Sequence, residues 1–226
     1  MRIGDVLKQL GSEGIEGLFA RRYAEFARSA ASMSRYRQAA ADVAERVQAG
    51  RILEVGPGPG YIAIEIAKLL PQAEVVGLDI SQTMVEIATR NAGEAGVADR
   101  VTFRLGNGAS VPFSPGSFDF VVSNGSLHEW KEPVAIFSAI YDVLKAGGQA
   151  LIGDLRRDAS KESKDEIARE IDSRLMRWGL RHSFAESHTR REIMNLLAET
   201  PFSEYRVDEG PVALSIHLRK NTLPSE

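Results

Sequence analysis

Short apolar runs alternate with stretches of three- and four-residue apolar spacing through the middle of the chain. The runs predict strands, and the spaced stretches predict helices. Five strands are expected at residues 51–55, 74–79, 101–105, 118–123 and 149–155. Helices are expected between them at residues 61–70, 81–95 and 133–144. Strands joined by helices of about ten residues are typical of parallel βαβ units, so this part predicts an α/β fold with a doubly wound sheet.

The flanks have a different pattern. Residues 15–49 show helical spacing, and so do residues 160–200, whereas 202–207 and 212–218 read as two closing strands. We therefore predict one domain over residues 1–226, with a mostly parallel seven-stranded sheet, N-terminal helices and a helical insert after the fifth strand. Its expected parts are N-terminal helices (1–49), a central core (50–158), the helical insert (159–200) and the closing strands (201–220).

Composition narrows the function classes. The chain has 226 residues, of which 43% are hydrophobic and 26% charged, as in an ordinary soluble globular protein. The net charge of −3 gives no general basic surface, so we expect no nucleic-acid partner. The absence of cysteine excludes disulfides, thiol catalysis and thiolate metal sites. The four histidines leave a His/carboxylate metal site conceivable, but nothing in the sequence supports one, so we expect no metal.

The chain ends show no targeting signal. The N-terminal Met1–Asp5 segment lacks an apolar signal region, and Pro224–Glu226 carries no lipidation box. No stretch approaches the length of a membrane span. The expectation is a cytoplasmic protein, of an oligomeric state that the sequence leaves open.

A glycine-rich loop is the first candidate site. Gly56, Gly58 and Gly60 alternate with prolines between the strand ending at Val55 and the helix opening at Tyr61. Glycines let the backbone approach a ligand, and the helix start supplies free N–H groups. The spacing differs from the Gly-x-Gly-x-x-Gly of dinucleotide binders, and a tight turn without function is the alternative.

Two acids strengthen the ligand hypothesis. Glu54 lies at the end of an apolar strand, where a carboxylate needs a partner such as a ligand ammonium group. Asp79 ends the second strand, where an acid can accept hydrogen bonds from a ribose diol. Its alternative role is to cap the helix that follows.

This arrangement resembles the class I S-adenosylmethionine (SAM)-dependent methyltransferases of the small-molecule type over about residues 50–155. The resemblance implies a Rossmann-like sheet, SAM as methyl donor and S-adenosylhomocysteine as product. It also implies that the N-terminal helices form a lid, that residues 50–158 bind SAM and that the insert covers the substrate. The residues on which the cofactor-binding role then falls are Glu54, Gly56, Gly58, Gly60, Tyr61, Asp79, Ile80, Asn107, Gly108, Ala109, Ser123, Asn124 and Tyr23.

Individual roles follow the same resemblance. Ile80 falls where a side chain covers the adenine, and Asn107 where the family often has an acid that contacts the adenine amino group. Ser123 and Asn124 fall beside the methionine part of SAM. Tyr23 lies on a lid helix, where relatives often have a tyrosine near the cofactor. For Tyr23 core packing, and for Asn107 a plain turn role, stay open.

His128 follows the fourth strand, at the place that the resemblance puts near the methyl group. Its ordinary pKa suits a general base near neutral pH. The alternative is a histidine that packs under the cofactor and bonds a backbone carbonyl. The Asn-Pro-Pro-Tyr type motif of enzymes that methylate exocyclic base or glutamine nitrogens is missing, since Ser123–Ser126 stands there.

Candidate substrate contacts lie after the fifth strand. Arg156 and Arg157 could clamp a carboxylate or phosphate, unless they belong to a solvated charge run. His182 lies in the insert. The resulting hypothesis is an enzyme that transfers a methyl group to a small-molecule acceptor by in-line displacement. The alternatives are a non-catalytic SAM-binding or partner protein, a methyltransferase of protein or RNA and, more weakly, a nicotinamide dehydrogenase.

Overall fold

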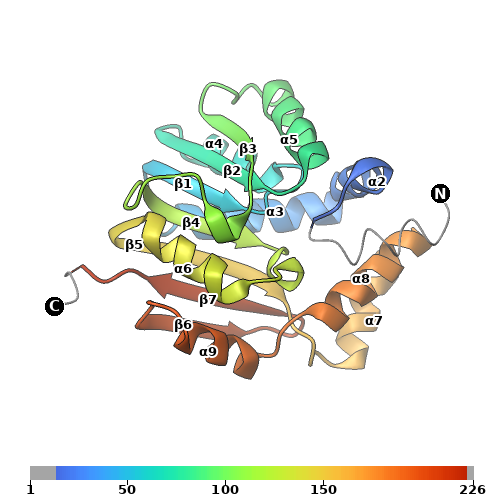
Figure 1. Cartoon of the computed structure of the whole chain (residues 1–226). Coiled ribbons are helices and arrows are strands. Elements are labelled where there is room, and N and C mark those ends of the chain that lie inside the picture. Colours follow the sequence, from blue (N-terminus) through green and yellow to red (C-terminus); the bar gives the residue numbers. More distant parts are fainter. Residues whose placement is uncertain (1–13, 223–226) are drawn as a thin grey trace.

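The computed structural model describes residues 14–222, so the predicted lid before residue 14 and the chain end at Pro224–Glu226 lie outside the described residues. One sheet of seven strands has the order β3-β2-β1-β4-β5-β7-β6 (Figure 1). The strands are β1 (Gly50–Val55), β2 (Ala73–Asp79), β3 (Val101–Leu105), β4 (Phe118–Asn124), β5 (Leu144–Leu155), β6 (Glu204–Glu209) and β7 (Ala213–Arg219). The predicted doubly wound α/β fold is confirmed.

Helices connect and flank these strands. They are α2 (Gly17–Ala27), α3 (Ala30–Ala44), α4 (Tyr61–Leu69), α5 (Gln82–Glu94), α6 (Pro133–Val143), α7 (Lys161–Arg169), α8 (Arg174–Glu186) and α9 (Arg190–Ala198). Two short 3-10 turns, η1 (Gly108–Ser110) and η2 (Leu127–Glu129), follow β3 and β4. Among residues 14–222, no helix combines the length and the apolar character that crossing a membrane requires.

The sheet topology fixes where a ligand can bind. Strands β1 to β5 are parallel, and β7 pairs antiparallel with both β5 and β6. The chain order reverses between β1 and β4, which lie side by side. A crevice opens at the carboxyl ends of parallel strands at such a reversal. The loops after β1, β2, β4 and β5 therefore meet at one edge.

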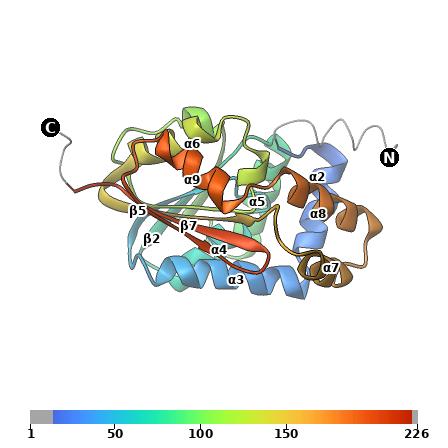
Figure 2. The ribbon, with the colours of Figure 1, turned by 90° about the horizontal axis from the view of Figure 1, so that it is seen from below.

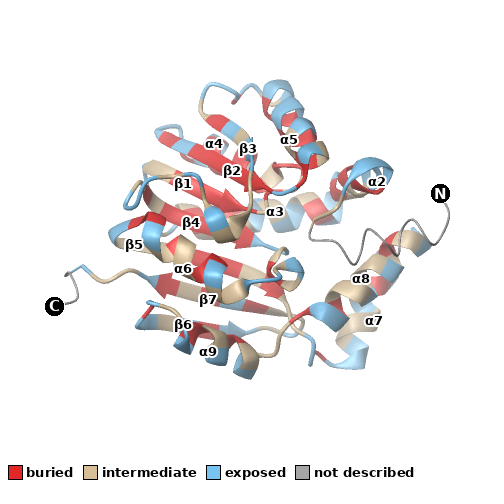
Figure 3. Ribbon diagram, in the orientation of Figure 1, coloured by how far each residue is buried: buried red, intermediate tan, exposed pale blue. Residues whose placement is uncertain are grey.

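Two hydrophobic layers hold the sheet between helices. One face buries apolar residues of α3, α4 and α5, and the other those of α6 and α9. Figure 2 shows α6 and α9 on one side of the sheet and α3 and α4 on the other, and Figure 3 shows the buried residues concentrated on the strands. The structure thus places α9, part of the predicted substrate cover, against the sheet instead.

Helices α2, α7 and α8 lie together beyond the carboxyl ends of the parallel strands (Figures 1 and 2). Phe19 of α2 packs with Met176 of α8, and Ala20 of α2 packs with Met84 and Ile87 of α5. Helix α2 thereby joins the insert to the sheet domain across the crevice.

Strand β5 begins five residues before the predicted position. Leu144 pairs with Phe118, and the Nζ of Lys145 lies 2.7 Å from Oδ1 of Asp119. The register shifts between Phe118 and Phe120, which pair with Leu144 and Gln149, so the shift admits the extra residues between these two positions of β5.

Candidate functional site

A cavity of about 560 Å³ occupies the crevice at the strand ends. The glycine loop, the ends of β2, β4 and β5, and helices α2, α3, α7 and α8 all contribute to its wall. The predicted residues in the lining are Tyr23, Glu54, Gly56, Gly58, Tyr61, Asp79, Ile80, Asn107, Gly108, Asn124 and His128. The predicted residues outside the lining are Gly60, Ala109, Ser123, Arg156, Arg157 and His182.

The glycine loop needs its glycines for two different reasons. Gly56 has φ +68°, and a Cβ there would lie 2.6 Å from the side chain of Ser126, which stands beside the loop. Gly60 has φ +79°, and a Cβ there would lie 2.6 Å from the ring of Phe103 and 2.9 Å from Ala88. Gly56 therefore shapes the cavity, whereas Gly60 lets Phe103 of β3 and Ala88 of α5 pack closely against the loop.

Glu54 is a buried carboxyl group at the bottom of the loop. Its residue is 2% exposed, and the backbone N–H of Ala63 donates to its Oε2 at 3.0 Å. Within residues 14–222 the second oxygen, Oε1, has no hydrogen-bond partner. Burial raises the pKa of Glu54 to about 8. The hydrogen bond from the N–H of Ala63 lowers this pKa, and the nearby charge of Asp79 raises it further. A cationic group in the cavity would stabilise the charged form.

Asp79 ties the end of β2 to the glycine loop. Its Oδ2 accepts from the N–H of Gly58 at 2.9 Å, and its Oδ1 accepts from the N–H of Ser81 at 2.9 Å. Burial raises its pKa against these hydrogen bonds. Ser81 itself caps α5, so the capping alternative belongs to Ser81 and Asp79 keeps a face on the cavity.

The loop after β3 also contributes to the cavity wall. The N–H of Ala109 donates to Oδ1 of Asn107 at 2.8 Å, so Asn107 caps the short turn η1 while still lining the cavity. Its turn role is therefore present, and contact with an adenine edge stays a prediction. Ile80 and Gly108 line the cavity as well.

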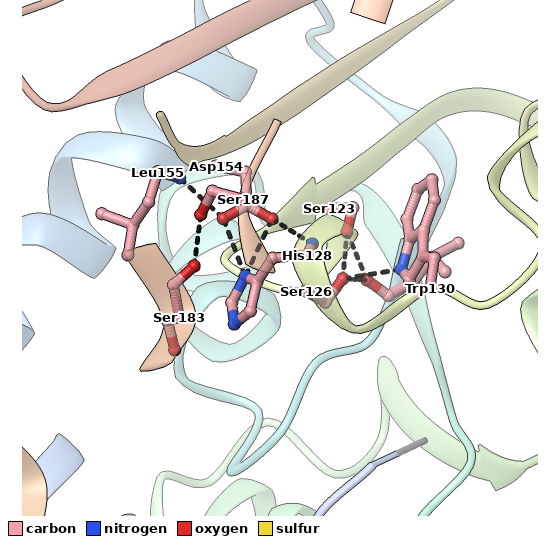
Figure 4. Close-up of polar contacts among 9 residues, drawn as sticks. Ser123, Ser126, His128, Trp130, Asp154, Leu155, Ser183 and Ser187 are labelled. Atoms are coloured by element: carbon pink, nitrogen blue, oxygen red, sulfur yellow. Dashed lines mark hydrogen bonds and ion pairs between the residues drawn. The ribbon is translucent and has the colours of Figure 1, made fainter. Parts of the chain in front are cut away.

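Ser123 lies behind the wall. Its Oγ donates to the backbone oxygen of Val55 at 2.7 Å and lies 2.7 Å from Oγ of Ser126 (Figure 4). The indole N–H of Trp130 donates to the same Ser126 oxygen at 3.2 Å. This chain joins the end of β1 to the loop after β4, so the structure supports a positioning contact for Ser123.

His128 and Asp154 form a buried pair. The Nδ1 atom of His128 lies 2.9 Å from Oδ1 and 3.1 Å from Oδ2 of Asp154, and its backbone N–H donates to Oδ2 at 2.8 Å (Figure 4). The two side chains are 9% and 3% exposed. Burial lowers the pKa of His128, but the charge and hydrogen bond of Asp154 outweigh it, so the pKa is raised above the ordinary 6.5.

The sequence interpretation missed Asp154 as a site residue. It lies at the carboxyl end of β5, 26 positions from His128, and lines the cavity. An acid that ends a buried parallel strand was the available signal. The sequence instead favoured the two arginines that follow as the substrate contacts.

Those arginines are engaged elsewhere. The Nε of Arg156 lies 2.8 Å from Oδ1 of Asp158, and its Nη2 lies 2.9 Å from Oε1 of Glu209. Arg157 pairs with Glu192. The structure thus gives the solvated ion-pair alternative and does not support an anion clamp.

His182 and Tyr23 lie on the helices over the cavity. The ring of His182 stacks on Trp178 with centroids 6.0 Å apart, and it does not line the cavity. Tyr23 does line it, and burial raises the pKa of its hydroxyl, with Tyr36 as the hydrogen-bond partner that lowers it. Tyr36 in turn packs on Tyr61 with ring centroids 5.7 Å apart.

The cavity is acidic. Over the part of the chain that the structure describes, Arg35 is the only arginine or lysine in its wall. The acids in the wall are Asp42, Glu54, Asp79, Glu129 and Asp154. Such a wall suits a cationic ligand and disfavours an anionic one.

The part of the chain that carries this geometry is similar to known proteins. Residues 52–148 match the family model described as a methyltransferase domain. Residues 52–148 therefore resemble a methyltransferase domain. The match covers the strands β1 to β4 and the loops that carry Glu54, Asp79, Asn107 and His128, so the class I resemblance is confirmed.

Two curated relatives of the methyltransferase domain are quinone-pathway enzymes by name. The demethylmenaquinone methyltransferase of Symbiobacterium thermophilum is 33% identical over 99 residues, which are 43% of this chain and 39% of the relative. The ubiquinone/menaquinone biosynthesis C-methyltransferase of Dinoroseobacter shibae is 37% identical over 106 residues, 46% of this chain and 42% of the relative. The chain therefore spans less than half the length of either relative.

A solved structure matches the methyltransferase domain and its flanks together. It comes from Methanococcus maripaludis and is provisionally assigned as an S-adenosyl-L-methionine-dependent methyltransferase. It is 28% identical, has a TM-score of 0.75, and the alignment covers 89% of this chain and 92% of that one. The alignment therefore includes the helices around the sheet as well as the strands.

Proposed function

We propose that the protein binds SAM in this cavity and transfers its methyl group to a small-molecule acceptor. The observation that carries the proposal is Glu54. A buried carboxyl with a free oxygen and a pKa raised to about 8 is costly unless a cation meets it, and SAM has an ammonium group to do so.

Other residues of the wall fit the rest of SAM. Asp79 would accept from the ribose hydroxyls, Ile80 would cover the adenine, and Asn107 would face its edge. Gly56 and Gly58 leave the room that the methionine part needs beside Asn124. The acidic wall favours the cationic sulfonium. Tyr61 and Gly108 complete the contact surface, whereas Gly60, Ala109 and Ser123 act from behind it.

The chain's own part in the reaction is mainly to position. Bound SAM supplies a methyl group that is already electrophilic. The cavity would hold the acceptor in line with it, and helices α2 and α8 would exclude water. Such positioning requires no metal. Within residues 14–222 no cluster of three or more histidine or acidic side chains is arranged to hold a metal ion.

Isothermal titration of the full chain with SAM tests the proposal, with NADH as the matched nucleotide control. We expect one SAM site that S-adenosylhomocysteine also fills, and no heat with NADH. The absence of heat and of a thermal shift at millimolar SAM would contradict the proposal. Binding of SAM with no transfer to any acceptor in a broad panel would favour a non-catalytic SAM-binding protein.

A further inference from the structure

The orientation of His128 defines a proton acceptor. A carboxylate only accepts hydrogen bonds, so the Nδ1 atom that faces Asp154 carries the ring proton in the neutral imidazole. The lone pair is then on Nε2. Within the described part of the chain Nε2 has no hydrogen-bond partner, and Figure 4 shows it directed away from Asp154. His128 lines the cavity, so this nitrogen is available to a bound molecule.

Asp154 fixes both the side chain and the backbone of His128. Its Oδ2 accepts from the N–H of His128 at 2.8 Å, and its Oδ1 also accepts from the N–H of Leu155 at 2.6 Å. The residue is 6% exposed. Asp154 therefore sets the position of the ring, its tautomer and, through its charge, its basicity.

The wall next to this pair is apolar. Helix α7 contributes Ile167, the segment between α7 and α8 contributes Ile171, α8 contributes Met176 and Leu180, and β7 contributes Leu214. Arg35, the single cation in the described wall, lies on α3 and faces Glu170 at 3.8 Å. Among the described residues, no cation is therefore placed at this apolar part of the cavity to hold an anionic acceptor.

We propose that the acceptor is an uncharged, largely apolar molecule bearing a hydroxyl group, and that His128 removes the hydroxyl proton while Asp154 acts as the positioning residue. This inference rests on the proposed function. It goes further by naming the acceptor class and the proton pathway.

The chemical step balances without another reactant. The acceptor oxygen forms a bond to the methyl carbon, and the bond between that carbon and the SAM sulfur breaks. The hydroxyl proton passes to Nε2 of His128. The products are a methyl ether, S-adenosylhomocysteine and an imidazolium that later loses its proton to water. A thiolate or a neutral amine would not need prior proton removal, so the buried pair would have no task there.

Several charged groups face His128 from the elements around it. They are Asp154 on β5, Glu129 on η2, Glu186 on α8 and His188 in the loop before α9. The three acids favour imidazolium, and Asp154 acts most strongly. Removing the charge of Asp154 leaves burial as the dominant influence, which lowers the pKa of His128.

The first test needs no acceptor and no SAM. NMR titration of the histidine rings in the full chain gives the pKa of His128, identified by its loss in His128→Gln. We expect a pKa above 6.5 that falls in Asp154→Asn. The matched control is the second histidine–acid pair, His217 and Asp208, whose nearest atoms are 3.2 Å apart on the outer strands. Asp208→Asn should leave the His128 signal unchanged.

The second test uses 4-butylphenol, 4-hexylphenol and 4-butylbenzenethiol as acceptors, with mass spectrometry of the products. The expected result is methyl ether formation with a rate that rises through the pKa of His128. His128→Gln should reduce transfer to the phenols on the order of 10²–10⁴-fold. Transfer to the thiol, which is largely thiolate near neutral pH, should change far less. In Asp154→Asn the rise should move to lower pH, and Asp208→Asn should behave as wild type.

The contradicting outcomes are distinct. Equal losses for phenol and thiol would assign His128 a structural role. A ring C-methyl product, or loss of phenol transfer in Glu129→Gln but not in His128→Gln, would also overturn the inference. SAM binding with no transfer to either phenol would contradict the hydroxyl acceptor yet leave the SAM site standing. Absence of SAM binding would instead remove the proposed function itself. If Asp154→Asn does not fold, His128→Gln alone decides the question.

Discussion

At the scale of single residues, the site combines buried charge with open hydrogen-bonding atoms. Glu54 and Asp79 are carboxyl groups inside the sheet edge, each with its pKa raised by burial. A protein that held no ligand there would gain stability from an apolar residue at either position. Their presence therefore indicates a ligand that compensates for their burial.

Glu54→Gln should weaken SAM binding. The variant keeps the shape of the side chain but removes the charge that faces the ammonium group, which costs about 1.5–3 kcal/mol of binding free energy. Titration calorimetry of both proteins gives the difference. Glu65→Gln is the control and should bind SAM as wild type does, because Glu65 of α4 pairs with Lys68 and with Arg37 of α3 and does not line the cavity. Equal affinities for Glu54→Gln and wild type would contradict the ammonium contact.

The pH dependence of stability follows from the same residue. The pKa of Glu54 is raised from 4.5 to about 8, so the folded protein without ligand holds a proton that the unfolded chain releases. This contribution to the free energy of unfolding is fully present below pH 4.5 and is lost as pH rises through 8. Denaturant titrations at pH 5, 7 and 9 should show a loss that Glu54→Gln lacks. A loss of the same size in the variant would assign it to other groups.

Asp79→Ala should weaken SAM binding by about 1.5–3 kcal/mol, because two charge-assisted hydrogen bonds to the ribose would be lost. The N–H groups of Gly58 and Ser81 would lose their acceptor as well, so thermal unfolding should be measured beside the calorimetry. An unchanged SAM affinity in a folded variant would exclude the ribose contact.

That Glu54, Gly56, Gly58 and Asp79 lie together at one cavity could be predicted from the sequence, because they belong to short local patterns. The pairing of His128 with Asp154 could not, since it joins two strand ends 26 positions apart that only the sheet order brings together. The ion pair between Arg156 and Glu209 could not be predicted for the same reason. Glu209 lies on β6, far along the chain.

At the scale of elements, the glycine loop is held from several sides. Gly58 bonds Asp79 at the end of β2, Ser126 stands against Gly56 from the loop after β4, and Phe103 of β3 packs against Gly60. The doubly wound, mostly parallel topology could be predicted from the βαβ pattern, whereas the order of the strands comes from the structure. The packing of α9 on the sheet could not, because the apolar spacing of a helix does not say which surface it covers.

Gly60→Ala should destabilise the fold more than Gly96→Ala. Both glycines have positive φ, +79° and +70°, so both variants strain the backbone, on the order of 1–3 kcal/mol. At Gly60 the new Cβ also meets Phe103 at 2.6 Å, whereas at Gly96 nothing lies within 4 Å. Thermal unfolding of the two variants compares them. Equal melting temperatures would show that the Phe103 ring moves aside without loss of stability.

At the scale of the whole molecule, the cavity lies between parts that are distant in sequence. Helix α2 contacts α5 of the sheet domain and α8 of the insert, so it closes the crevice over the cofactor side. The predicted division into lid, core and cover includes α2 in the lid and α7 and α8 in the cover. It stays a prediction until ligand binding is followed along the chain.

Amide hydrogen exchange should follow ligand binding through this closure. S-adenosylhomocysteine should slow exchange in α2 and α8, because both line the cavity, and should leave local opening of α9 on the far sheet face unchanged. Conditions without global unfolding are required, since binding also raises overall stability. Protection confined to the glycine loop would contradict a closing role for α2 and α8.

A crystal structure of the full chain with S-adenosylhomocysteine tests the central claim most directly. The account predicts the amino group of the ligand within hydrogen-bonding distance of Glu54 and its ribose diol on Asp79. The sulfur of the ligand should face the part of the cavity that His128 and Asp154 line. A ligand outside this cavity, or one bound in it with Glu54 and Asp79 uncontacted, would contradict the account.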